Sequence, residues 1–412
     1  MKHRVVITGI GALTAMGHGV EGLRSGLRAQ KSPVRFIEQF ETTDFYAKCA
    51  AWASDYDPTH YFPPHRLKRL DRYAQFCMVV TRQALEDAGI APCPEAPTFD
   101  IGVSFGTALG GITNAENQHM RFLREGAKAI PASLALQVFG GSAHTNIAIA
   151  SGFRGYGTTN SNSCASGTVS VGEAYRVLRD GMARVMVAGS AETPLAQLTF
   201  GAFDVIKTMS KETQHPELAC RPFDRRRSGF VMSEAASALV LETEEHALER
   251  GARIYAEVLG YTLNNDAYHM TSSLPEGTAA IEAMVRSLDE AKLKPGQIGY
   301  INAHASSTPM NDEHEQHAIT KLFGEKTPAV SGTKAYYGHP LGAAGGVEAA
   351  ICALAISDEY LPETLNCEEP ELAPGFDLIM GEPRRQRVNY VMSNSFGFGG
   401  INATLVLGRY GL

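Results

Sequence analysis

The chain has 412 residues, of which 44% are hydrophobic and 20% are charged, and its formal net charge is −7. This composition excludes a mainly disordered chain, because such chains have too few apolar side chains to build a core. No apolar run reaches the roughly 18 residues of a membrane-spanning helix. The acidic balance argues against general nucleic-acid binding, because phosphate backbones attract basic surfaces. We therefore expect a folded protein that binds neither membranes nor nucleic acid.

The seven cysteines are widely spaced and form no Cys-x-x-Cys pair. Their number and spacing argue against a disulfide framework and against a zinc site. The N-terminus has a basic start and an apolar run, but Thr8, Gly9 and Gly11 interrupt that run and no signal-peptide cleavage pattern follows. We expect a cytoplasmic protein with no metal at its catalytic site and no redox or nucleotide cofactor.

Short β-branched runs alternate with helical patterns along the chain. Strands are expected at residues 4–11, 100–106, 183–192 and 237–243, then at 253–263 and as a pair within 388–408. Helices are expected to end near Gly89 and Gly152. Alternation of this kind indicates parallel strands joined by crossover helices. No Pro-rich or Gly/Ser-rich linker separates the two parts, so we expect two α/β halves packed as one body.

Three motifs resemble known sites but have simpler interpretations. Residues 9–14 begin like a dinucleotide-binding loop, yet a threonine replaces the third glycine, which favours a tight strand-to-helix turn. Residues 102–106 match a hydrolase G-x-S-x-G with Ser104 as nucleophile, but TALGG follows instead of a helix. His314 and His317 lie one turn apart on a polar helix, and no third ligand at fixed spacing supports a metal site.

Cys164 is the first residue that points to chemistry. A polar run leads to it, and small residues follow before a helix whose apolar positions are Val169, Ala174, Val177 and Leu178. At a helix N-terminus, unpaired N–H groups and the helix dipole favour a thiolate, so we expect a lowered pKa and a nucleophilic sulfur. On this segment alone, a buried structural cysteine explains the pattern equally well.

The second half of the chain favours a catalytic rather than a structural role for Cys164. His304 follows an expected strand, and Lys334 and His339 lie in a glycine-rich segment that leads into a helix. Residues 393–400, SNSFGFGG, form a third such loop, whose glycines allow backbone N–H groups to face a ligand. Two histidines in strand-end loops, together with a helix-terminal cysteine, indicate a catalytic site.

With these motifs in this order, the sequence resembles the β-ketoacyl-acyl carrier protein synthases, the condensing enzymes of the thiolase superfamily. The motifs are RVVITGIGAL, RPFDRRRSGFV, DAYHMTS, NAHASSTP, GHPLGAAGGVEA and NSFGFGG. The chain is similar both to type II elongating synthases and to type II polyketide ketosynthases. The resemblance implies a thiolase-like five-layered α/β/α/β/α fold of two pseudo-symmetric halves, residues 1–250 with the cysteine and 251–412 with the histidines.

The resemblance also implies roles for individual residues. Cys164 would accept the acyl group, and His304 and His339 would complete a Cys-His-His triad. Lys334 would hold His304 in position, with Glu348 as its charge partner. Asp312 and Glu315 match the family's supporting acidic pair. The substrate-binding set would comprise Ser306, Thr308, Leu109, Thr271, Phe398 and Gly399.

Two further roles are implied by the resemblance. The N–H groups of Cys164 and Phe398 would form the oxyanion hole, and Phe398 would gate the acyl pocket. Lys68 and Arg69 match docking positions for an acidic carrier protein, and Lys207 would add to that patch, although a solvated charge cluster is the simpler alternative. A structural monovalent cation would lie near three residues, Asn302, Glu348 and Asn394.

Three functions fit this sequence. The first is decarboxylative condensation of a cysteine-bound acyl group with malonyl-acyl carrier protein in fatty-acid elongation, with phosphopantetheine delivered on the carrier. The second is a ketosynthase of a polyketide or polyene pathway, paired with a chain-length partner instead of forming a homodimer. The third is a non-catalytic subunit, against which Cys164 and both histidines argue. The unusual segment 130–141, where the pocket wall is expected, leaves the acyl chain length open.

Overall fold

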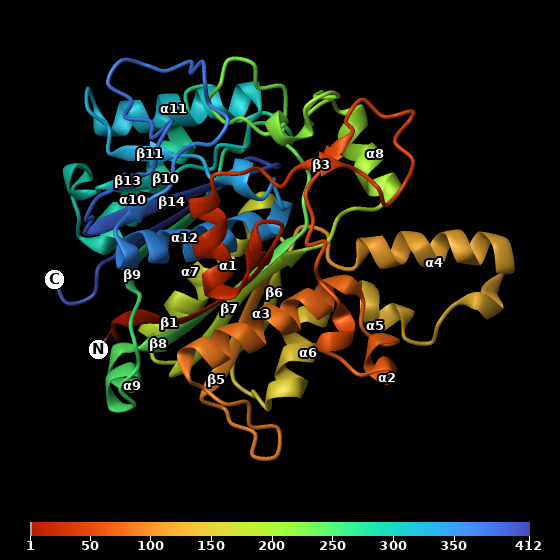
Figure 1. The fold of residues 1–412 in the computed structure, drawn as a ribbon. Helices are drawn as coiled ribbons and strands as arrows, with labels where there is room; N and C mark the ends of the chain where they lie inside the picture. Colours follow the sequence, from red (N-terminus) through yellow and green to blue (C-terminus); the bar gives the residue numbers. More distant parts are fainter. Residues whose placement is uncertain (1) are drawn as a thin grey trace.

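The computed structural model describes residues 2–412, and Figure 1 shows their layered arrangement. The main strands form one continuous 11-stranded sheet, which divides at a single short pairing into two parts that we call the first and the second sheet. Each part contains both parallel and antiparallel pairs. The first has the order β6 (Gly157–Asn160), β5 (Ile101–Gly106), β7 (Val185–Glu192), β8 (Ala235–Thr243), β1 (Val5–Thr14). The second has the order β11 (Ala329–Ser331), β10 (Tyr300–Asn302), β14 (Tyr390–Gly397), β15 (Ile401–Gly408), β9 (Ala256–Asn265).

Each sheet has the same pattern of strand directions. β1 is antiparallel to β8, β8 is antiparallel to β7, and β5 and β6 then run parallel to β7. The second sheet repeats this order with β9, β15, β14, β10 and β11. A short antiparallel pairing of Val5–Ile7 with residues 256–258 joins the sheets. The expected parallel arrangement is therefore correct for only part of each sheet.

Helices make up the other three layers (Figure 1). α3 (Arg72–Ala88) and α6 (Ser142–Ser151) cover the outer face of the first sheet. α10 (Thr278–Ala291) and α11 (Pro309–Phe323) cover the outer face of the second. α7 (Ser166–Arg179) and α12 (Ala344–Asp358) pack against each other between the sheets. This arrangement confirms the five-layered fold, while the division of the chain at residue 250 stays a prediction.

The remaining elements lie around these layers. They include α1 (Gly19–Ala29), α2 (Pro64–Leu67), α8 (Gln197–Val205), α9 (Glu244–Glu249), and the short strands β2 (Gly17–His18), β3 (Arg35–Phe36), β4 (Cys49–Ala50), β12 (Tyr360–Leu361) and β13 (Arg384–Arg385). α4 (Ile112–Glu125) and α5 (Leu134–Val138) form an excursion that extends away from the body (Figure 1). No side chain of α4 is buried, so this excursion adds little to the core.

The N-terminal glycine motif is a strand, not the expected turn. β1 continues through Gly9 and Gly11 to Thr14. A Cβ at Gly9 would lie 2.2 Å from the carbonyl oxygen of Ala84, and one at Gly11 would lie 2.0 Å from that of Val80. These glycines therefore allow α3 to pack directly on the strand backbone. Ser104 lies inside β5 and is fully buried, which excludes a nucleophile elbow there.

α12 explains a strongly apolar segment. By length and composition alone, residues 341–358 would suffice to cross a membrane, and 89% of the segment is buried inside the fold. Apolar side chains lie all around this helix instead of on one face, because other elements surround it. This is the pattern expected of a helix in the central layer of a five-layered fold.

Candidate active site

Cys164 lies at the entrance to the central helix α7. It belongs to a single 3₁₀ turn, Ser163–Ala165, which leads directly into α7. This confirms the expected position at a helix N-terminus. The side chain is buried, with a residue exposure of 8%, and it lines a cavity.

The pKa of the Cys164 thiol is raised to about 11, contrary to the expectation of a lowered value. Burial is the main cause, because it removes water from around the charged sulfur. The Ser163 hydroxyl, the charge of Lys334 and the backbone N–H of Phe398 lower this pKa, while the buried Glu192 carboxylate raises it. Partners that favour the thiolate are therefore needed to make the sulfur reactive.

A glycine contact brings the α7 and α12 segments together. A Cβ at Gly167, in the first turn of α7, would lie 2.4 Å from the backbone nitrogen of Gly346 in α12. Cys164 precedes the first of these helices and His339 precedes the second. The close approach of the two backbones therefore fixes the relative position of these two segments.

His304 and His339 lie edge to face in the same cavity as Cys164. Their ring centroids are 5.2 Å apart and their planes are inclined by 79°. Burial and the neighbouring Lys334 hold both histidine pKa values well below 6.5. Both rings are therefore neutral near pH 7, so each has a single N–H to donate.

Lys334 and Glu348 form a fully buried ion pair behind His304. The Lys334 Nζ atom contacts a Glu348 carboxylate oxygen and the His304 carbonyl oxygen. It also lies 3.4 Å from His304 Nδ1. An ammonium that donates to Nδ1 leaves the ring proton on Nε2. Lys334 thus contacts His304 directly, and its implied role in holding that ring stays a prediction.

The two acidic residues of α11 support the backbone around His304. Glu315 accepts hydrogen bonds from the N–H groups of His304 and Ala305, both at 2.8 Å. Asp312 accepts from the N–H groups of Phe223 at 3.0 Å and Ser307 at 3.2 Å. Burial raises the pKa of Glu315 to about 8. The two carboxylates thus hold the backbone of this loop by hydrogen bonds.

The cavity has a volume of about 340 Å³ and opens from Cys164 toward solvent. Ser306 and Thr308 lie on its wall with their hydroxyl oxygens 2.9 Å apart. Thr271 also lines it, on the loop after β9. A cavity of this size with convergent hydroxyl groups suits an extended polar chain.

Phe398 lies at this cavity, on the turn between β14 and β15. Its ring stacks on Phe203 of α8 with centroids 6.2 Å apart. The next residue, Gly399, has a φ of 87° and donates a backbone hydrogen bond of 2.7 Å to Met270. Gly399 does not line the cavity, although Gly397 and Gly400 do.

Leu109 and two of the basic residues also lie outside the cavity. Leu109 packs in an apolar cluster with Cys164, Phe200 and Leu341. These side chains fill the space where the base of the pocket was expected. Lys207 lines the cavity, with its ammonium 5.6 Å from the ring centre of Tyr46. Lys68 and Arg69 are exposed on the connection between α2 and α3 and do not line it.

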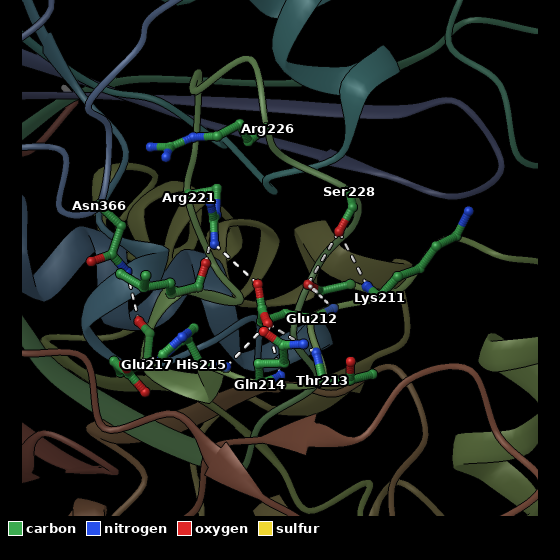
Figure 2. Close-up of polar contacts among 12 residues, drawn as sticks. Lys211, Glu212, Thr213, Gln214, His215, Glu217, Arg221, Arg226, Ser228 and Asn366 are labelled. Atoms are coloured by element: carbon green, nitrogen blue, oxygen red, sulfur yellow. Dashed lines mark hydrogen bonds and ion pairs between the residues drawn. The ribbon is translucent and has the colours of Figure 1, made fainter.

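The segment between α8 and β8 forms one wall of the cavity and is held by its own polar contacts (Figure 2). Glu212 accepts hydrogen bonds of 2.9–3.1 Å from the backbone N–H groups of Thr213, Gln214 and His215. It also pairs with Arg221 at 3.4 Å. Ser228, which lines the cavity, accepts from the N–H of Lys211. These contacts hold the wall in place around a single 3₁₀ turn, Pro216–Leu218.

Glu192 is a buried residue at the site that sequence reasoning missed. One carboxylate oxygen accepts from Thr107 Oγ1 and the N–H of Leu109, and the other from the N–H groups of Ala108 and Gly342. Burial raises its pKa to about 7. It ties a loop of the first half to the loop after His339. The signal in the sequence was an acidic residue that ends an otherwise apolar strand.

Comparison with known protein families decides the classification. The model described as "Beta-ketoacyl synthase, N-terminal domain" matches residues 2–247, and "Beta-ketoacyl synthase, C-terminal domain" matches residues 255–368. The chain belongs to the beta-ketoacyl synthase family. Members of this family are condensing acyltransferases, so the protein is an enzyme of that class.

Similar proteins support both branches of this synthase family. A 3-oxoacyl-[acyl-carrier-protein] synthase 2 from Synechocystis sp. is 36% identical, with 99% of each chain covered. The ishigamide ketosynthase/chain length factor structure has a TM-score of 0.93 and 32% identity, with 100% of each chain covered. A type II PKS ketosynthase in complex with its acyl-carrier protein, AntDE:AntF, has a TM-score of 0.91 and 29% identity, with 99% and 100% covered.

Proposed function

We propose that this synthase condenses a Cys164-bound acyl group with malonyl-acyl carrier protein to give 3-oxoacyl-acyl carrier protein in fatty-acid elongation. The observation that carries this proposal is that Cys164, His304 and His339 line one cavity. A buried sulfur beside two neutral histidines suits acyl transfer followed by enolate stabilisation.

In the first step, the Cys164 sulfur attacks the thioester of an acyl carrier protein. The backbone N–H groups of Cys164 and Phe398 stabilise the oxyanion of the tetrahedral intermediate. The carrier arm leaves as a free thiol and takes the proton that Cys164 gives up. The product is an acyl-cysteine thioester, and Phe398 gates the pocket that receives its chain.

In the second step, malonyl carrier protein places its phosphopantetheine arm along Ser306, Thr308 and Thr271. Loss of carbon dioxide leaves an enolate, and the Nε2–H groups of His304 and His339 donate hydrogen bonds to its oxygen. The enolate carbon attacks the acyl-cysteine and displaces the sulfur, which takes up a proton. Lys334 and Glu348 keep His304 in the tautomer that this step requires.

We also propose a monovalent cation in the interior behind the histidines. Asn302 Oδ1, Glu348 Oε2 and Ser393 Oγ are fully buried and lack a hydrogen-bond partner, and oxygen ligands of this kind fit a hard cation. Asn394 fits less well, because its Oδ1 already accepts from Thr404 at 3.0 Å. A cation there would give these buried oxygen atoms the partner that they lack.

The proposed partner is an acidic acyl carrier protein that docks at the cavity mouth in the cytoplasm. Lys207 lines that mouth, and Lys68 and Arg69 add positive charge on a separate segment. Basic patches of this type guide acidic partners into register.

We propose a homodimer as the resting assembly. Large apolar side chains are exposed between residues 120 and 156, among them Leu123 at 63%, Leu136 at 67% and Ile149 at 71%. Strand β6, in the same region, ends its sheet and pairs only with β5. An apolar surface beside an open strand edge suits a second chain. Light scattering after gel filtration tests this.

A polyketide or polyene ketosynthase is the second candidate. It is supported by the similarity to the ishigamide and AntDE:AntF structures. In that case the exposed surface of residues 120–156 would bind a chain-length partner. Inactivity of the purified chain alone with saturated acyl carriers, restored by a partner chain, would favour this candidate.

The test is intact mass after incubation with saturated and polyunsaturated acyl carrier proteins, followed by malonyl carrier protein. We expect an adduct on the wild type and none on Cys164→Ala. Turnover of saturated chains by the protein alone would support fatty-acid elongation. Absence of any adduct would contradict a stand-alone synthase.

A further inference from the structure

Ser163 immediately precedes the nucleophile, and its hydroxyl oxygen lies 3.8 Å from Cys164 Sγ. This contact falls within hydrogen-bonding range for a large, diffuse acceptor such as sulfur. Among residues 2–412, no other side chain hydrogen-bonds this sulfur. The Ser163 hydroxyl is therefore a side-chain proton donor in direct contact with the atom on which the proposed chemistry depends.

The backbone at Ser163 adopts an uncommon conformation. Its φ is 51°, in the left-handed region that residues with a Cβ rarely occupy. Its carbonyl oxygen accepts a hydrogen bond from the Ser166 hydroxyl at 2.7 Å, which locks the turn into α7. Strain of this kind is found where a side chain must point in one particular direction.

Strand β14, which leads into the turn that holds Phe398, also confines the Ser163 side chain. A Cβ built at Gly397 would lie 3.2 Å from Ser163 Cβ and 3.4 Å from its oxygen. The seryl side chain therefore packs against the Gly397 backbone, next to the turn that holds Phe398. Its hydroxyl is held between this strand and the Cys164 sulfur.

We propose that Ser163 is a catalytic residue whose hydroxyl donates a hydrogen bond to the Cys164 thiolate and activates it for acyl transfer. The proposal rests on the proposed function only in taking Cys164 as the nucleophile. The hydroxyl keeps its own proton, and the thiol proton still leaves on the carrier's sulfur. A thioester sulfur is a poor acceptor, so the contact acts in acylation and not in decarboxylation.

The first test is the rate of Cys164 alkylation by iodoacetamide as a function of pH. We expect Ser163→Ala to move the midpoint upward by about half to one pH unit. At about 1.36 kcal/mol per unit this shift equals about 0.7–1.4 kcal/mol, the contribution of a single long hydrogen bond. Below the midpoint the variant should react about threefold more slowly, because the gain in thiolate basicity offsets part of the loss of thiolate.

Matched variants separate the hydroxyl from the fold. Ser163→Gly also removes the hydroxyl but suits a φ of 51° without strain, so it should raise the midpoint as Ser163→Ala does. Ser161→Ala removes a nearby hydroxyl that instead donates to the Ala108 carbonyl, and should leave the profile unchanged. All these proteins keep the other titratable groups around this sulfur, which are Lys334, Glu192, His304 and His339.

The plot of alkylation rate against pH separates two explanations, a lost hydrogen bond and a distorted site. Loss of an activating hydroxyl slows alkylation only below the midpoint, whereas a distorted site slows it at every pH. A wild-type midpoint in Ser163→Ala, or uniform slowing, would overturn the proposal. With carrier substrates, acylation should slow while decarboxylation by the acylated enzyme keeps its rate. The alkylation test needs no carrier protein, so its outcome does not depend on which acyl chain or pathway this synthase serves.

Discussion

The ring of Phe398 lies nearly parallel to that of Phe203, with centroids 6.2 Å apart and planes inclined by 18°. This stack connects the glycine-rich turn after β14 to helix α8. α8 is held at its N-terminus by Glu116 of α4, which accepts from the N–H groups of Leu198 at 2.9 Å and Thr199 at 2.7 Å. The gate that we propose at Phe398 therefore packs on a helix that is itself anchored.

We predict that Phe203→Ala loosens this gate. Offset aromatic stacking contributes about 1 kcal/mol, so Cys164 alkylation by iodoacetamide should become about fivefold faster, while condensation slows. The combination with Phe398→Ala should show little further change in alkylation, because each substitution removes the same stack. Additive effects of the two substitutions in the alkylation assay would contradict this coupling.

The buried Lys334–Glu348 pair should be costly to break from one side. Glu348→Gln leaves the ammonium uncompensated, and we expect a loss of about 3–5 kcal/mol in the free energy of unfolding by urea. Lys334→Met with Glu348→Leu removes both charges and should recover much of that loss. The exposed pair Arg82–Glu86 is the control, since Glu86→Gln should cost less than about 1 kcal/mol. Equal losses at both sites would refute the expectation.

The buried histidines should lower the free energy of unfolding as the pH falls. The pKa of His304 lies well below 6.5 in the folded state because of burial, Lys334 and His339, and near 6.5 in the unfolded chain. Below pH 6.5 the unfolded chain binds a proton that the folded state does not, so stability is complete above pH 6.5 and falls on acidification. Glu192 and Glu315, with pKa values raised to about 7 and about 8, gain protons in the folded state over the same range and oppose this loss. The histidine contribution is therefore measured as the difference between the wild type and a His304 variant in urea unfolding at pH 7.5 and 5.5.

His304→Gln should reduce that acid-induced loss, because the variant no longer has this proton to bind on unfolding. His60→Gln, at an exposed loop position, serves as the control. The expectation fails if the two variants lose the same free energy as the wild type between these pH values.

The close packing of α3 on β1 predicts a large effect from one methyl group. A Cβ at Gly11 would overlap the carbonyl oxygen of Val80 at 2.0 Å, so Gly11→Ala should lower the melting temperature by several degrees through overpacking, at about 1–3 kcal/mol. Gly296→Ala meets no atom within 4 Å and should be nearly neutral. Thermal unfolding followed by circular dichroism measures both.

Local sequence patterns predicted the elements better than their contacts. The strand at Val185–Glu192 was predicted from its continuous apolar run, and its burial on both faces confirms this. The glycines of β1 were misread because a pattern of glycines does not distinguish a turn from a surface that receives a helix. Strand direction was partly wrong for a similar reason, since antiparallel neighbours such as β1 and β8 are far apart in sequence.

The residues of the active site were likewise predicted better than their surroundings. Cys164 and His304 were found from the segments that contain them. The raised pKa of Cys164 was missed, because it depends on burial by residues from distant parts of the chain. Leu109 was expected at a pocket base that the surrounding side chains fill. Segment motifs identify which groups are reactive, while their surroundings emerge only from the packing.

The contact of Gly167 with Gly346 makes the spacing between two parts of the site rigid. Side chains change rotamer at little cost, but two backbones in van der Waals contact act as a hard stop that compresses very little. The spacing between the nucleophile's turn and the segment of His339 is thus set by main-chain atoms. We infer that thermal motion of surrounding side chains leaves this spacing nearly constant, so the catalytic geometry is already in place before any substrate arrives.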